Sequence, residues 1–151
     1  NGEIIMIMKK LALSFLVLIL VTPISGCSSR ISEIALKDLI TNLEQKGFNV
    51  ISKDEKKEIF QGKRKSLSIN KNENIYVYLY QTNEKMEEDS SSIDIGGTSY
   101  NNGKDNADIE WASLPHFFKK DNIIVLYVGE NSAIIEALEE ILGKQFAGYV
   151  E

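Results

Sequence analysis

Two segments of the chain carry apolar residues at the three- and four-residue spacing of an amphipathic helix. The first covers residues 33–46, with Ser32 as N-cap and Gly47 after its end. The second follows Ser132 as N-cap and ends at Gly143. Its inward-facing residues are Ile134, Ile135, Leu138, Ile141 and Leu142. Serine accepts hydrogen bonds from first-turn amides and glycine adopts the left-handed turn that ends a helix, so we predict a helix in each segment.

Other segments alternate apolar and polar residues, which is typical of strands. Residues 66–69 and 75–80 are separated by a turn at 71–74, so we predict an antiparallel hairpin. In the second strand, apolar residues face one side and a tyrosine row faces the other: Tyr76, Tyr78 and Tyr80. Two more strands are predicted at 108–114 and 123–128, joined by a hairpin connection over 115–122.

A further helix is predicted after Asn83, with the sparse apolar face of Met86, Ser90 and Ile93. The glycine- and asparagine-rich residues 96–106 are expected to form a surface loop. The predicted order is therefore helix, two strands, helix, two strands, helix. Under the two-layer rule this order indicates an α+β fold, an antiparallel sheet of about four strands with the helices packed on one face.

The N-terminal region has the composition of a secretory signal. Lys9 and Lys10 precede an apolar run at 11–21, and small residues precede Cys27, the one cysteine of the chain. The run is shorter than the roughly 20 residues of a transmembrane helix. Ile24, Ser25, Gly26 and Cys27 resemble the signal-peptidase recognition box of bacterial lipoproteins.

The resemblance implies that the Cys27 thiol is joined to diacylglycerol and becomes the first residue after cleavage. We therefore expect a signal peptide at 1–26, a lipidated tether at 27–31 and one α+β domain at 32–151. Residues 1–7 are interpreted as a mis-called start, because Met8 begins a complete signal. The expected location is the outer face of a cell membrane, with the lipid as the contact to the membrane.

Charge excludes some partners. Without residues 1–26 the chain has 15 basic and 21 acidic residues, a net charge of −6, which disfavours nucleic acid as a partner. With Cys27 acylated, no thiol remains for a disulfide. We expect no cofactor.

Candidate catalytic groups are few. His116 is the one histidine, so the sequence offers no histidine pair for zinc. Asp105, Asp108 and Glu110 lie close in sequence, and a pair of them would suit glycan hydrolysis or calcium. We favour the interpretation that these carboxylates are solvated, because the spacing of a calcium-binding loop is absent.

The segment 111–120 concentrates aromatic residues around a proline: Trp111, His116, Phe117 and Phe118. Together with the tyrosine row it is either a binding patch for a peptide, glycan or protein, or part of the core. We favour the second interpretation for Trp111 and one phenylalanine, with His116 capping a turn, because a small domain needs aromatic volume in its core.

The segment 111–120, the strand 122–129 and the ending 142–148 resemble small, mostly uncharacterised lipoproteins of Bacillus and Clostridium relatives. The resemblance implies a Gram-positive origin and brings no activity. The leading hypothesis is a non-enzymatic, lipid-anchored binding or accessory module. Two alternatives are a small wall-active or glycan-processing enzyme that uses Asp108 or Glu110 beside Trp111, and a structural protein that self-associates through the tyrosine row.

Overall fold

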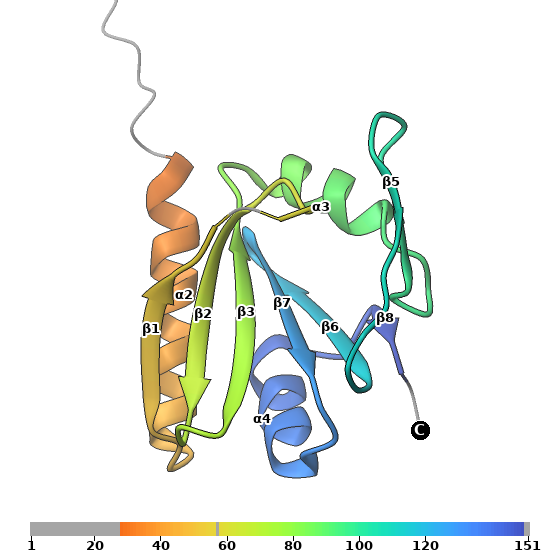
Figure 1. Ribbon diagram of the computed structural model, residues 1–151. Helices are drawn as coiled ribbons and strands as arrows, with labels where there is room; N and C mark the ends of the chain where they lie inside the picture. The colour runs from red at the N-terminus through yellow and green to blue at the C-terminus, as the bar shows by residue number, and fades with distance from the viewer. Residues whose placement is uncertain (1–27, 57, 150–151) are drawn as a thin grey trace, which may run out of the picture.

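A six-stranded antiparallel sheet forms the centre of the structure, a computed structural model that describes residues 28–56 and 58–149 (Figure 1). In spatial order its strands are β1 (Val50–Asp54), β2 (Lys63–Ile69), β3 (Glu73–Leu79), β7 (Ile123–Val128), β6 (Pro115–Lys120) and β8 (Ala147–Gly148). The helices are α2 (Ser28–Gln45), α3 (Asn83–Ser91) and α4 (Ser132–Leu142). A separate ribbon pairs β4 (Ser99–Asn101) with β5 (Asn106–Asp108). The predicted α+β class is confirmed, with more strands than expected.

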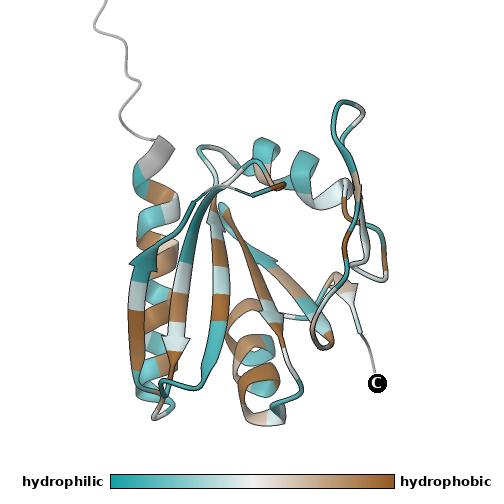
Figure 2. Ribbon diagram, in the orientation of Figure 1, coloured by the Kyte–Doolittle hydropathy of each residue, from teal (hydrophilic) through white to brown (hydrophobic). Residues whose placement is uncertain are grey.

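Helices α2 and α4 cover one face of the sheet with an apolar layer (Figures 1 and 2). Leu36, Leu39 and Leu43 project from α2 at helical spacing and are buried against the strands. Ile134 and Leu138 do the same from α4. Burial of these side chains is the main source of stability on this face, because each fully buried leucine or isoleucine contributes about 1.5–3 kcal/mol.

The opposite face of the sheet is also covered, which corrects the prediction that helices pack on one face. Met86 of α3, Tyr100 of β4 and Phe60 pack there against Phe117 and Leu126 of the sheet. Phe60 makes edge-to-face ring contacts with Tyr100 and Phe117 at centroid distances of 5.3 and 5.9 Å. The protein therefore has three layers, and its central strands are buried on both sides.

Strand β6 replaces the predicted hairpin connection over 115–122. Four consecutive residues, 115–118, are buried, because the strand lies between two covered faces and shows no polar alternation. The connection to β7 is only Asp121 and Asn122, with Asp121 at a φ of 51°. The alternation over 108–114 does not produce the predicted strand, since β5 ends at Asp108.

Helix boundaries also differ from the prediction. Helix α2 begins at Ser28, so residues 28–31 of the expected tether are helical and Ser32 is buried inside the helix. Thr82, not Asn83, caps α3, and Asn131, not Ser132, caps α4 through its side chain. Among the described residues, no helix combines the length and the apolar composition that crossing a bilayer requires.

The α2 layer gives a direct test of the core. Leu43 has no exposed surface, so Leu43→Ala should lower the free energy of unfolding by about 2–5 kcal/mol. Urea denaturation of the chain from residue 28 onward measures this change. The matched control is Ile34→Ala on the same helix, where the side chain is 52% exposed and the expected change is within about 0.5 kcal/mol. Equal losses in both variants would contradict the assignment of the buried face.

Candidate functional site

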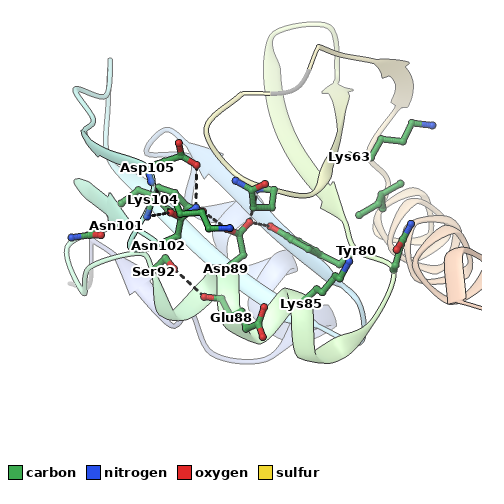
Figure 3. A pocket seen from close by; sticks show the side chains of 14 residues that line it. Lys63, Tyr80, Lys85, Glu88, Asp89, Ser92, Asn101, Asn102, Lys104 and Asp105 are labelled. Atoms are coloured by element: carbon green, nitrogen blue, oxygen red, sulfur yellow. Dashed lines mark hydrogen bonds between the residues drawn. The ribbon is translucent and has the colours of Figure 1, made fainter.

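A polar groove opens on the face of the sheet that carries α3 and the β4–β5 ribbon (Figure 3). Its volume is about 980 Å³. Side chains reach it from the segment before β2, from the end of β3, from α3 and from the ribbon. Most of them are polar: Gln61, Lys63, Tyr80, Gln81, Lys85, Glu88, Asp89, Ser92, Tyr100, Asn101, Asn102, Lys104 and Asp105.

Asp89 of α3 lies at the floor of the groove and is 3% exposed. Its Oδ2 accepts hydrogen bonds from the Tyr80 hydroxyl at 2.5 Å and from the backbone N–H of Gln61 at 2.7 Å. Its Oδ1 accepts a hydrogen bond from the Tyr100 hydroxyl. Three donors from three separate segments therefore satisfy one buried carboxylate, as a buried charge requires.

The same contact changes the acidity of the tyrosines. Burial, with the Asp89 carboxylate as the next cause, raises the pKa of Tyr80 well above its ordinary value of 10.0. Burial and the hydrogen bond to Asp89 raise the pKa of Tyr100 to about 12. Burial also raises the pKa of Tyr78 on the same face. The raised pKa values keep all three hydroxyls protonated to higher pH than usual, and the hydroxyls of Tyr80 and Tyr100 donate to Asp89.

The formal charges of the side chains that line the groove cancel. The lining contains three lysines, Lys63, Lys85 and Lys104, and three acidic residues, Glu88, Asp89 and Asp105. Lys63 lies 3.8 Å from Asp54 of β1, and no ion pair within 28–56 and 58–149 involves Lys85 or Lys104. These two ammonium groups are exposed at the rim, where they are free to contact a ligand.

Asn102 links the floor of the groove to its rim. Its Nδ2 donates to the Tyr100 hydroxyl at 3.0 Å and to Asp105 Oδ2 at 3.2 Å. Its Oδ1 accepts from the backbone amides of Lys104 and Asp105, which shapes the tip between β4 and β5. The ribbon is thereby tied to Asp89 through Tyr100.

The aromatic segment is part of the core and does not form an exposed patch. Phe117 and Phe118 are fully buried on opposite faces of the sheet. Trp111 is half-buried, and its Nε1 donates to the Gly97 carbonyl at 2.7 Å. His116 lies within β6, 4% exposed, where its ring nitrogens lie 3.0 Å from Gln145 Oε1 and 3.1 Å from the Gly129 carbonyl. The prediction that His116 caps a turn is therefore wrong.

The tyrosine row is also covered. Tyr78 and Tyr80 are buried beneath Phe60 and α3, and Tyr76 is half-buried under the Arg64 guanidinium, 4.1 Å from its ring centroid. The row therefore does not provide the exposed surface that docking or self-association through it requires. Of the row, Tyr80 lines the groove.

Of the three predicted carboxylates, one belongs to the groove. Asp105 lines the groove, whereas Asp108 and Glu110 are exposed and do not belong to its lining. Among the residues that the structure describes, no group of three or more histidine, cysteine or acidic side chains is placed to hold a metal ion. Ile24, Ser25, Gly26 and Cys27 lie outside the described residues.

Asp89 and Tyr100 were missed by the sequence analysis. A signal was present, because Asp89 follows Met86 by three residues and so shares the inward face of α3. A carboxylate on an inward helix face indicates a buried polar contact. The partners, Tyr80 just after β3 and Tyr100 of β4, lie outside α3, so the helical pattern does not specify them and only the tertiary structure reveals them.

No protein-family model matches the chain, and neither a curated protein nor a solved structure matches it significantly.

The tyrosine cluster predicts a loss of stability at high pH. Unfolded tyrosines lose their protons near pH 10, whereas Tyr78, Tyr80 and Tyr100 keep theirs in the folded state. The unfolded state then binds fewer protons, so the free energy of unfolding should fall above about pH 10 by roughly 1.4 kcal/mol per pH unit for each tyrosine. Urea denaturation at a series of pH values measures the slope.

Tyr100→Phe is the matched control for this slope, because it keeps the ring and removes one titrating hydroxyl. Its free energy of unfolding should fall less steeply, by roughly the contribution of one tyrosine between about pH 10 and pH 12. A variant with an unchanged slope would show that Tyr100 does not retain its proton in the folded state.

Proposed function

We propose that the chain is a non-enzymatic binding module, anchored by a lipid on Cys27 to the outer face of a bacterial membrane. The support for the anchor is the signal pattern at 8–27, in which a basic start, a short apolar run and small residues precede the cysteine. A single cysteine at that position fits acylation, since diacylglycerol needs one thiol.

The groove is the proposed ligand site. The observation that carries this proposal is a cavity of about 980 Å³ with a rigid polar floor and two exposed lysines without ion-pair partners in the described part of the chain. Asp89 and the two tyrosines are fixed by mutual hydrogen bonds, which gives the floor a preorganised shape. Concave sites of this size are the usual places where proteins bind small molecules.

The lining favours a glycan as ligand. The exposed side chains of Asn101, Lys85 and Lys104 line the groove and present hydrogen-bond donors, which suit sugar hydroxyls and the carbonyls of acetamido groups. The three lysines and three acidic residues leave the groove near neutral, so a strongly charged ligand has no excess of opposite charge to meet. A protein tethered beneath a Gram-positive wall would meet such glycans continually.

Lipid attachment is tested by labelling cells with a clickable fatty acid. The wild-type chain should incorporate the label and sediment with membranes. Cys27→Ser should carry no label and accumulate as precursor or released protein, because serine offers no thiolate. Lys53→Ala, an exposed position on β1, is the control and should behave as wild type. An unlabelled wild-type protein would contradict the anchor.

Glycan binding is tested by titrating the chain from residue 28 onward with chitotetraose and with a soluble muropeptide, followed by NMR. Amide shifts should cluster in residues around Asn102 and Lys85. Lys85→Ala should weaken binding by roughly tenfold, because a hydrogen bond from a charged donor contributes about 1.5 kcal/mol or more. Lys37→Ala, remote from the groove, should bind unchanged. Equal affinities of the two variants, or shifts outside the groove, would contradict the proposed site.

A further inference from the structure

Two large apolar side chains are exposed on the first turns of α2. Ile31 is 51% exposed and Ile34 is 52% exposed. They differ from the rest of the apolar residues of this helix, which face the sheet, including Leu36, Leu39 and Leu43. Figure 1 shows these turns extending past the end of β1, at the point where the chain enters the fold.

Helix geometry places the two isoleucines together on the outward side. At 3.6 residues per turn, residues 31 and 34 are roughly 60° apart around the axis. The same geometry places them on the side opposite to the centre of the buried leucine face. In the sequence, Cys27, Ile31 and Ile34 have the spacing i, i+4 and i+7 that is typical of one helix face.

No spacer separates this surface from the lipidation position, because α2 begins at Ser28. At a rise of 1.5 Å per residue, Ile31 and Ile34 lie about 4.5 Å and about 9 Å along the helix axis from Ser28, the residue that follows Cys27 in the sequence. The headgroup region of one leaflet is about 5–8 Å thick. An anchor at Cys27 therefore brings both side chains to the bilayer surface.

We propose that Ile31 and Ile34 form a membrane-contact surface that inserts into the bilayer interface beside the lipid on Cys27. The inference rests on the proposed lipid attachment and adds an orientation for the domain. Arg30 and Lys37, both exposed on the adjacent side of α2, suit contact with anionic headgroups. Asp38 is exposed one turn after Ile34 and limits the inserted part to the first turns of α2.

This orientation has a consequence for the groove. Helix α2 covers one face of the sheet, and the groove lies on the other face with α3 and the ribbon. Only the first turns of α2 reach the bilayer, so the face of the sheet that carries the groove stays outside the inserted part.

The test uses the full chain, expressed in a Gram-positive host and purified as the lipidated protein. Once Cys27 is acylated, Ile34→Cys introduces the single free thiol, to which an environment-sensitive fluorophore is attached. The protein is reconstituted into vesicles of phosphatidylglycerol and phosphatidylethanolamine, with or without a lipid-borne nitroxide quencher. Glu44→Cys, an exposed position near the far end of α2, is the matched control.

The probe at residue 34 should show blue-shifted emission and quenching at least about threefold stronger than the probe at residue 44. Mass spectrometry of the same samples establishes whether the lipid is present. Equal quenching at the two positions in lipidated protein would overturn the inference and leave the anchor intact. A protein without lipid would overturn both. A blue shift that appears only at high protein density, without quenching from the lipid, would assign the surface to a second copy and overturn the membrane contact.

Discussion

The buried carboxylate of Asp89 holds the polar layer of this protein onto its sheet. Helix α3 has one large apolar residue in its buried face, Met86, beside Asp89 and Ser90. Apolar burial alone therefore attaches it weakly. Hydrogen bonds from Tyr80 and Tyr100 to Asp89, and from Lys119 of β6 to Glu87 and Ser90, add to the attachment. The hydrogen bonds to Asp89 join β3, α3 and β4, so the floor of the groove exists because this carboxylate is satisfied.

The two faces of the sheet thus have different roles. On one face, α2 and α4 bury mainly aliphatic side chains, and this apolar burial is the main source of stability there. On the other, aromatic rings carry the hydroxyl groups that meet Asp89, so this face combines a core with a polar cavity. The proposed membrane contact and the proposed ligand site lie on opposite sides of this arrangement, which allows both to be occupied at once.

Much of the fold follows from local pattern. The helical spacing of 33–46 and 132–142 and the alternation at 66–69 and 75–80 predict α2, α4, β2 and β3 near their observed positions. Strand β6 was missed because residues 115–118 are buried on both sides, and a continuous apolar run with proline does not reveal a strand by its period. The ends of helices were displaced because several neighbouring serine, threonine and asparagine residues compete as caps.

By itself, the sequence determined the α+β class and the buried stripe of each long helix, because these depend on residues a few positions apart. It also showed that the tyrosines of β3 all face one side. Whether that face of the sheet is exposed to solvent or covered depends on Phe60, α3 and the β4–β5 ribbon, which come from other parts of the chain. Only the tertiary structure decided the groove, because its floor requires Asp89 of α3 to contact Tyr80 and Tyr100 from two other segments. The alternation of apolar and polar residues in a strand specifies which face of the sheet a side chain lies on, and it does not specify which residue packs against that side chain.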